Sequence, residues 1–532
     1  MNKARLVGTS DILPVGVDAA DWKAVDSHSH HLRGGDLSYG ATNKNTVEYA
    51  LKNSLAAVGV GSVWEPVSCD HYRQYEGRDR DLYYSGNIDP QSLMDKAEIQ
   101  RMLDDLNHIA EGRVLFYLDN ETPKGSRAHM WWFGYNYDFP AWHDYSQDRP
   151  VQYCSFDRAD INTVSGKPHT RRCIFEILAT QRSAGALGVF AHPTSWWMDG
   201  NDFITNIAAE CVMHLYADGY LDGIAVQGYD ACQRHYQNLW FHLLDTGAIV
   251  PGFAETDAPH SHSKTLNDPL YKSMLKMPDK VSIDAITTAV RNGACYCATS
   301  GFLHLSVDGV EMGGVVKTDS SRTHKAVVSA LPFDGRDRFS RIELIGRGGV
   351  VVAQIKEFTS GSIEFEFSGS DTHGYLVARG YGENCDPDDP VMQNIKQFAI
   401  TNPVYLHPRG YRFVPVTTDF TLHVTVGSEW VGENVEFQHA NGEMIERANI
   451  DKPGDIDITL PASARVVLKK ENSEKKMFYI AMENKAVWDN IKYLSTGEFL
   501  KDYPDAVPGE VPPDAFRLEK MKRDMASSTV SI

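Results

Sequence analysis

The hydrophobic pattern changes near Gly301, and this change limits what the 532-residue chain can fold into. Before Gly301, short apolar runs alternate with stretches whose apolar residues recur at helical spacing, which is typical of strand–helix units around a parallel sheet. After it, short apolar runs are separated by Gly, Asp and Asn turns, which is typical of antiparallel sheets. The chain is longer than one ordinary domain, so we expect at least two.

The first half contains about seven strand–helix units, which predicts an α/β fold with a distorted, closed (β/α)7 TIM-like barrel. We expect strands near 24–30, 62–67, 114–118, 187–191, 223–226, 249–254 and 294–298. We expect helices near 45–58, 90–111, 171–183, 202–217, 235–244 and 282–292. In such barrels, functional residues follow the carboxyl ends of the strands.

These patterns divide the chain into four segments. Residues 1–23 form an N-terminal segment, and residues 24–300 form the barrel, with an aromatic insertion over 122–169. Residues 301–410 form an antiparallel β-sandwich. Residues 411–532 form a second small β unit with a helical or extended tail.

The net charge of −19 and the lack of a basic stripe argue against nucleic acid or an anionic membrane as a partner. We find neither the apolar core of a signal peptide nor an apolar run of roughly 20 residues. The eight cysteines form no Cys-x-x-Cys pair, which argues against a zinc knuckle or disulfide framework. We therefore predict a cytoplasmic protein with a small-molecule substrate, and we leave homo-oligomerisation open.

The segment Asp26-Ser27-His28-Ser29-His30 follows a short apolar run. Residues two apart on a strand point to the same side, so His28 and His30 would lie together. Neutral imidazole is a good ligand for zinc, iron and manganese. The two side chains therefore form a candidate pair of metal ligands, and the alternative is two unrelated surface histidines.

Imidazoles and carboxylates also follow other predicted strands. They are His71, Glu121, His129, His192, Asp257, His260 and His262. A single histidine is commonly solvated. Here, however, imidazole or carboxylate side chains follow several predicted strands at the same end of the barrel. Carboxylates among imidazoles suit two or three divalent ions (Zn, Mn or Fe), because a carboxylate can bridge ions and offset their charge.

Taken jointly, these motifs resemble the polymerase-and-histidinol-phosphatase (PHP) superfamily, and more narrowly its carbaryl-hydrolase (CehA/McbA) type. The resemblance covers about residues 22–405 and rests on the segments 26–30, 69–71, 120–122, 128–130, 191–193 and 256–260. Asp257-Ala-Pro-His260 departs from the usual Asp-x-His, which makes His262 a rival to His260 as a ligand.

The resemblance implies a metal cluster. His28, His30, Glu121 and Asp257 would hold one ion, and Glu121, His129 and His192 would hold its neighbour. His71 and His260 would hold a third, helped by Asp36 or His31. Asp257, His129 or His260 would move the proton during catalysis.

Aromatic residues crowd the segment 130–156, which follows the third predicted strand. An aromatic pocket or lid would bind an apolar or aromatic substrate, and packing of the rings on one another is the alternative. The candidate substrate-binding residues are Trp131, Trp132, Trp196, Trp197 and Arg127.

The sequence therefore predicts a metal-dependent hydrolase that acts on a small, aromatic organic ester, carbamate or amide. Three alternatives stay open: a phosphoesterase, a metal-dependent lyase on an aromatic compound, and a non-catalytic binding protein. The metal site itself does not choose among the hydrolytic substrates.

Overall fold

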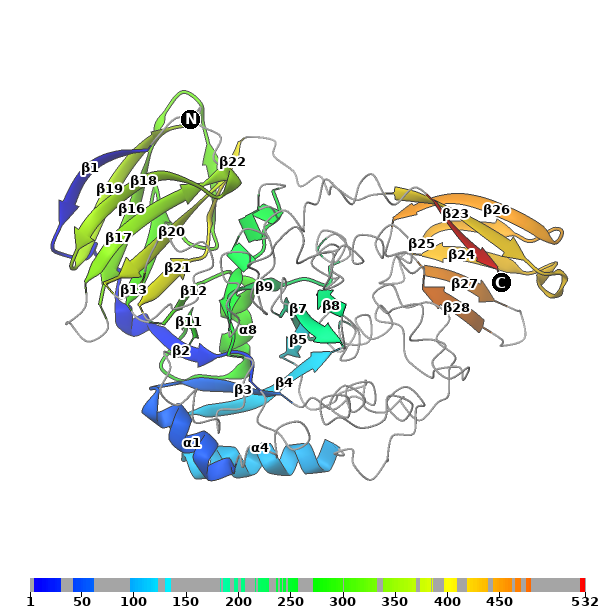
Figure 1. The fold of residues 1–532 in the computed structure, drawn as a ribbon, viewed down its shortest axis with the longest axis horizontal. Helices are drawn as coiled ribbons and strands as arrows, with labels where there is room; N and C mark the ends of the chain where they lie inside the picture. The colour runs from blue at the N-terminus through cyan, green and yellow to red at the C-terminus, as the bar shows by residue number, and fades with distance from the viewer. Residues whose placement is uncertain are drawn as a thin grey trace.

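The computed structural model describes strands and three α-helices distributed along the chain. The described residues are 4–29, 42–61, 96–122, 130–134, 182, 185–191, 196–199, 202–205, 216, 219–228, 236, 237, 240, 241, 243, 244, 247–256, 271–299, 301–332, 338–369, 374–383, 385, 397–408, 419–438, 444–461, 465–469, 475–479 and 527–531. In Figure 1, a β-sandwich lies at one end of the molecule and a smaller β unit containing the C-terminus lies at the other.

One mixed sheet of 15 strands runs through both halves of the chain. Its strands are β2 (Trp22–Asp26), β3 (Ala57–Gly61), β4 (Leu115–Thr122), β5 (Met130–Phe133), β6 (Leu187–Phe190), β9 (Gly223–Gln227), β10 (Gly252–Ala254), β11 (Lys272–Lys276), β12 (Cys295–Ala298), β15 (Val315–Thr318), β17 (Phe339–Gly346), β18 (Val350–Phe358), β20 (Tyr375–Gly382), β21 (Phe398–Thr401) and β22 (Val404–Pro408). The order is β10-β9-β6-β5-β4-β3-β2-β11-β12-β21-β20-β17-β18, with β22 and β15 attached through β20.

The predicted (β/α)7 TIM-like barrel is wrong. Parallel ladders do join β2 to β3, β3 to β4, β6 to β9 and β9 to β10. Antiparallel strands interrupt them, because β5 pairs between β4 and β6, and β11 pairs between β2 and β12. Within the described residues the sheet does not close on itself by a ladder, and it continues through β12 and β21 into the second half of the chain.

The error has an identifiable cause at β5. Its aromatic sequence, Met-Trp-Trp-Phe, falls within the segment that we predicted to be an insertion over the site. Aromatic residues also favour strands, and an antiparallel neighbour needs no crossover helix. The strand positions were predicted better than the topology. The strand expected at 62–67 lies outside the described residues, and β3 directly precedes that segment. The backbone at 202–205, expected to be helical, forms β8 (Asp202–Thr205), which pairs with β7 (Trp196–Asp199).

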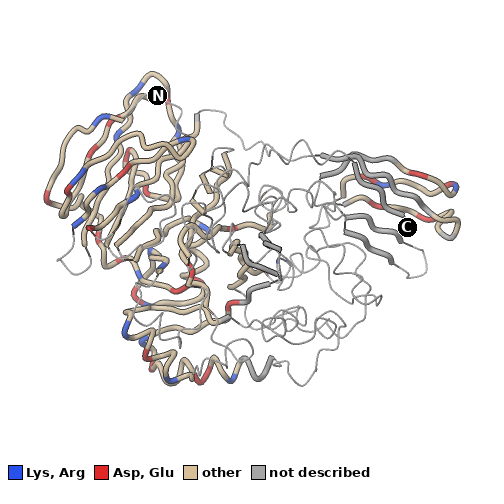
Figure 2. The backbone as a smooth tube through the Cα atoms, in the orientation of Figure 1, with Lys and Arg blue, Asp and Glu red and all other residues tan. Residues whose placement is uncertain are grey.

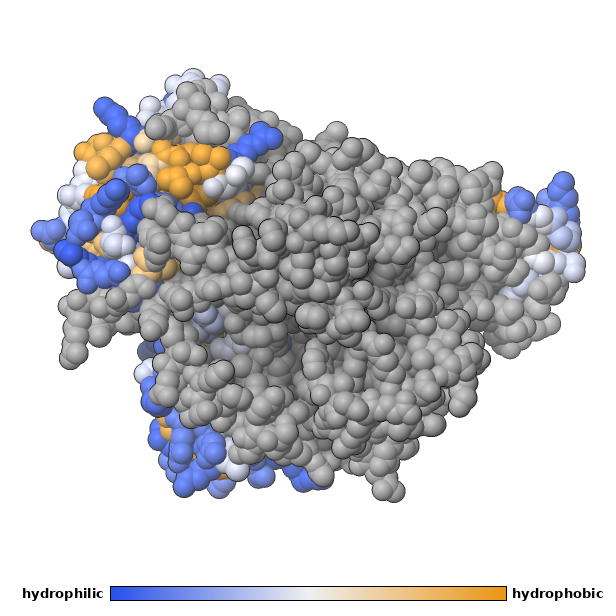
Figure 3. Space-filling model, in the orientation of Figure 1, coloured by the Kyte–Doolittle hydropathy of each residue, from blue (hydrophilic) through white to orange (hydrophobic). Residues whose placement is uncertain are grey.

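The three described α-helices lie close to predicted positions. They are α1 (Asn43–Lys52), α4 (Lys96–Ala110) and α8 (Ile283–Arg291). The side chains of Thr42 and Ser282 cap α1 and α8 by accepting hydrogen bonds from backbone N–H groups in the first turn. Helices α1 and α4 pack together (Figure 1), and the space-filling view shows hydrophilic atoms over their outer side (Figure 3).

The antiparallel β-sandwich predicted after Gly301 fits the structure, although the sandwich also includes a strand from the N-terminal segment. A five-stranded sheet is built from β1 (Arg5–Ser10), β19 (Gly361–Ser368), β16 (Thr323–Leu331), β13 (Phe302–Val307) and β14 (Val310–Glu311). It packs against the strands of the large sheet that come from the second half of the chain, and the shared core includes Leu305, Leu344 and Phe365. Burial of this apolar surface is the main driving force for the packing.

The N-terminal strand β1 belongs to this sandwich. It pairs with β19, and the Ala4 N–H donates to the carbonyl of Val352 on β18, 3.1 Å away. The N-terminal segment therefore contacts both sheets of the sandwich before the chain enters β2.

The C-terminal unit contains two further sheets. One is β26-β23-β29 and the other is β25-β24-β27-β28, with bounds β23 (Asp419–Val426), β24 (Asn434–Gln438), β25 (Met444–Asn449), β26 (Gly454–Pro461), β27 (Arg465–Lys469), β28 (Lys475–Tyr479) and β29 (Ser527–Ser531). Short 3-10 helices occur at η1 (Ala19–Asp21), η6 (Arg347–Gly349) and η7 (Ser428–Trp430).

Charged residues of both signs are mixed along the sandwich strands and along α4 (Figure 2). No helix in the described part of the chain is both long and apolar enough to cross a membrane.

A polar cluster joins β11 to the sandwich and predicts a pH-dependent stability. Lys276 Nζ lies 2.7 Å from Glu311 Oε2, and His304 Nε2 lies 3.7 Å from Glu311 Oε1. His304 first, and then Lys276, lower the pKa of Glu311 to about 2, against the opposing effect of partial burial. Because the folded-state pKa is lowered, this stabilisation is present above pH 4.5 and is lost as the pH falls towards 2.

We expect Glu311→Gln to show a smaller loss of unfolding free energy than the wild type between pH 5 and pH 2, measured by urea denaturation. The same loss in both proteins would contradict this role for Glu311.

Candidate functional site

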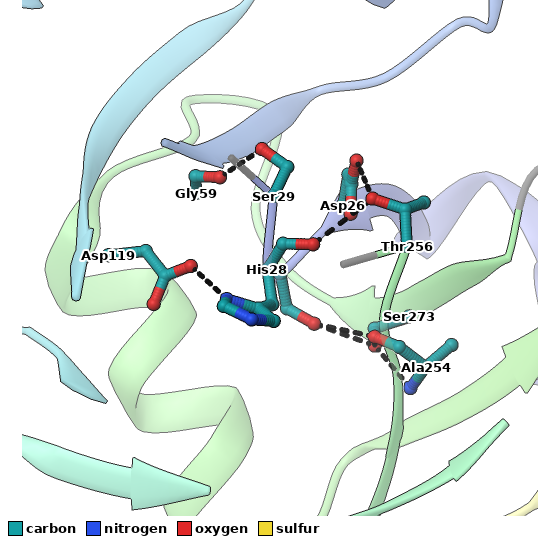
Figure 4. A network of polar contacts seen from close by, with 9 residues as sticks. Asp26, His28, Ser29, Gly59, Asp119, Ala254, Thr256 and Ser273 are labelled. Carbon is teal, nitrogen blue, oxygen red and sulfur yellow. Dashed lines mark hydrogen bonds and ion pairs between the residues drawn. The ribbon is translucent and has the colours of Figure 1, made fainter. Parts of the chain in front are cut away.

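The end of β2 carries a histidine whose orientation is fixed by a carboxylate. His28 Nδ1 donates to Asp119 Oδ2 at 2.6 Å, and both side chains are fully buried (Figure 4). Asp119 lies on β4, so the contact joins two strands of the parallel part of the sheet. With Nδ1 donating, Nε2 is the nitrogen that carries the lone pair of the neutral ring and would bind a metal.

The residues after β10 reach the same strand end. The Thr256 N–H donates to the carbonyl of His28 at 3.3 Å, and the Thr256 hydroxyl donates to the carboxylate of Asp26 at 3.0 Å (Figure 4). Complete burial raises the pKa of Asp26 to about 8, although the Thr256 hydrogen bond and the nearby His28 act in the opposite direction. These contacts bring β10 and β2 together although no ladder joins them among the described residues.

Two serines fix the backbone on either side of His28. Ser27 Oγ donates to the carbonyl of Ala254 at 2.7 Å. Ser29 Oγ donates to the carbonyl of Gly59 at 2.6 Å (Figure 4). A Cβ at Gly59 would lie 2.6 Å from the Ser27 carbonyl oxygen, so this close approach of β3 to β2 requires glycine. The imidazole is thus held by hydrogen bonds along its own backbone as well as by Asp119.

An indole ring covers one face of the histidine. The Trp131 ring stacks on His28 with centroids 5.1 Å apart and planes 3° apart, and Trp131 is fully buried. Trp132 is also fully buried, with the Arg182 guanidinium 5.9 Å from the centre of its ring. Trp131 therefore contributes to the shape of the site next to His28.

The structure describes the side chains of three predicted site residues, His28, Trp131 and Trp132. It describes the backbone alone for Glu121 on β4 and for Trp196 and Trp197 on β7. The other predicted site residues lie outside the described residues: His30, His71, Arg127, His129, His192, Asp257 and His260.

Among the described residues, no group of three or more His, Cys, Asp or Glu side chains is arranged to hold a metal ion. The described residues therefore do not contain the complete metal site that the sequence predicted. The described portion contributes the side chain of His28 and the backbone of Glu121 on β4.

Sequence reasoning missed the partners that define this site. Asp119 is separated from His28 by 91 residues, and nothing in the local pattern at 115–122 distinguishes it from a surface carboxylate. Thr256 was noted only as part of an Asp-containing motif, and Gln227 was not singled out at all. The position of Gln227 at the carboxyl end of a predicted strand was the available signal.

No protein-family model and no curated protein matches the chain. Solved structures similar to it include the major pilin subunit BcpA of Bacillus cereus (10% identity), the TIE protein of Bacillus anthracis (9%) and a backbone pilin of Streptococcus pyogenes (10%). Each match covers 34% of this chain, and 64%, 38% and 52% of those chains respectively. The TM-score is 0.12 in each case, which establishes neither a shared fold nor a shared function.

Proposed function

We propose that the chain is a metal-dependent hydrolase, related to the carbaryl-hydrolase type, that acts on a small aromatic ester, carbamate or amide. The observation that carries this proposal is the buried hydrogen bond between His28 and Asp119 at the end of β2. A histidine that binds a metal commonly donates its other ring N–H to a carboxylate, which fixes the tautomer and makes the ring a better ligand.

The donor set fits a divalent ion. His28 supplies an imidazole, and Glu121 is two residues further along β4 than Asp119. Asp257 follows Thr256, whose N–H is bonded to the His28 carbonyl. Imidazole and carboxylate are the ligands that zinc, manganese and iron use in hydrolases, so His28, His30, Glu121 and Asp257 would hold one ion.

In this function, the chain's own residues orient and shield the reacting groups. Asp119 holds the imidazole of His28, and Trp131 covers one face of the ring. A bound divalent ion would supply a water whose pKa is lowered to about 7. Asp257, His129 or His260 would accept the proton of that water and deliver it to the leaving group.

We propose a cytoplasmic location, because the buried thiols of Cys295 and Cys297 form no disulfide and thiols stay reduced in that compartment. We also propose a small-molecule substrate rather than a nucleic acid or a membrane, since the formal net charge is −19.

Metal analysis of the purified protein, followed by a panel of aryl esters, carbamates, amides and phosphate esters, tests the function. We expect bound divalent metal and hydrolysis of the carbon-based substrates, and we expect Glu121→Gln and Asp257→Asn to lose activity by at least about 100-fold while staying folded.

Three outcomes would contradict the proposal. Release of phosphate without turnover of the other substrates would indicate a phosphoesterase. A product without oxygen from labelled water would indicate a lyase. A protein that neither contains nor takes up metal would indicate a binding function.

A further inference from the structure

A buried glutamine lies beside the candidate site, and its side-chain amide makes no hydrogen bond to the described residues. Gln227 is the last residue of β9 and is fully buried. Within the described part of the chain, neither Oε1 nor Nε2 of its side chain has a hydrogen-bond partner. Burying an unsatisfied amide costs on the order of 1–3 kcal/mol, so a group of this kind needs an explanation such as a ligand or a water.

The backbone connects Gln227 to His28 in two steps. The Glu255 N–H donates to the Gln227 carbonyl at 3.0 Å, and the next residue, Thr256, donates to the His28 carbonyl at 3.3 Å. The ends of β9, β10 and β2 therefore lie side by side. A Cβ on Gly228 would lie 3.0 Å from Glu255 Oε1, so the chain after Gln227 runs beside another buried carboxylate.

The β9 ladder is irregular at this point. Ala225 pairs with Phe253 and Gln227 pairs with Ala254, which leaves Val226 as an extra residue on β9. Bulges of this kind change the direction of a side chain and are common next to active sites. Gln227 is thus placed at the strand end by a local departure from regular pairing.

We propose that the Gln227 side chain binds the H–N–C=O group of an amide or carbamate substrate. The side-chain amide presents one donor edge and one acceptor edge together, which matches a group that has both an N–H and a carbonyl oxygen. A phosphate ester dianion offers acceptors alone and would leave Oε1 of Gln227 buried without a donor. This inference rests on the proposed function and narrows its substrate class, with Gln227 as a specificity residue.

The test compares two ligands of the same shape on the metal-loaded full chain by calorimetry. Benzamide has the N–H donor, and acetophenone has a methyl group in its place. We expect the wild type to bind benzamide roughly tenfold tighter than acetophenone. We expect the ratio to fall to about one in Gln227→Met, with an unchanged or higher Tm because an unpaired amide has been removed.

Gln237→Met is the matched control. Gln237 is also a fully buried glutamine, but its Oε1 accepts a hydrogen bond from Arg379 at 2.8 Å. This variant should lower Tm and leave the binding ratio at its wild-type value.

Two results would overturn the inference: equal binding of the two ligands by the wild type, or a tenfold ratio that persists in Gln227→Met. Equal binding by the wild type does not depend on how any variant folds. It would mean that a water, and not the ligand, is bound to the side-chain amide of Gln227. Failure of the proposed function is separate, because it appears as absent turnover on the ester, carbamate and amide panel whatever the binding ratio is.

Discussion

Asp119→Asn is expected to reduce metal affinity or kcat/KM by between roughly 10- and 100-fold while the protein stays folded. Asp119 accepts a 2.6 Å hydrogen bond from His28 in a fully buried site. Asparagine keeps the shape and can still accept the hydrogen bond, but it removes the negative charge that makes the ring a better ligand. The measurement is metal affinity by chelator competition, together with kcat and KM on the best substrate.

The sandwich contains a matched control for this substitution. His324 Nδ1 donates to Asp308 Oδ2 at 2.7 Å, and His324 is fully buried. Asp308→Asn therefore makes the same chemical change in a His–Asp pair outside the candidate site, and it should lower Tm without changing metal affinity or kinetics. Wild-type metal affinity and kinetics in Asp119→Asn would show that the His28 pair is only structural.

Local signals in the sequence predicted individual elements well. The helical spacing of apolar residues placed α1 and α8. In the structure, the side chains of Thr42 and Ser282 cap their first turns. Apolar runs placed β6 and β9 to within one residue or two. These signals depend on neighbouring residues, and tertiary context overrode them at 202–205, where the predicted helix is the strand β8.

Topology and partners could not be predicted in this way. The strand β11 is five residues long and has a lysine at each end, so its sequence contains no apolar run that would predict a strand. Its position between β2 and β12 decides that the sheet continues into the sandwich. The same limit applies to the site, because the end of β2 predicted His28 as a candidate ligand but not Asp119, which meets it only after folding.

Arg379→Met is expected to lower the unfolding free energy by about 3 kcal/mol, which is the largest stability effect that we predict. Arg379 on β20 donates to Glu343 Oε2 on β17 at 2.8 Å, and both side chains are almost fully buried. A second nitrogen of Arg379 donates to Gln237, which comes from the first half of the chain. Among the residues that the structure describes, the buried carboxylate of Glu343 would then keep Arg341, whose Nε lies 3.0 Å from Glu343 Oε1.

Two further variants separate a buried charge from a simple loss of contacts. Arg379→Met combined with Glu343→Leu removes both charges, and we expect it to recover at least half of the lost free energy, because an apolar replacement of a buried ion pair is commonly near neutral. Arg5→Met breaks an exposed pair with Glu366 at 2.8 Å, and should leave urea denaturation unchanged within error. Equal losses of unfolding free energy from Arg379→Met and Arg5→Met would mean that burial does not govern the energetics of these ion pairs. They would also mean that the hydrogen bond from Arg379 to Gln237 does not stabilise the packing of the two halves of the chain.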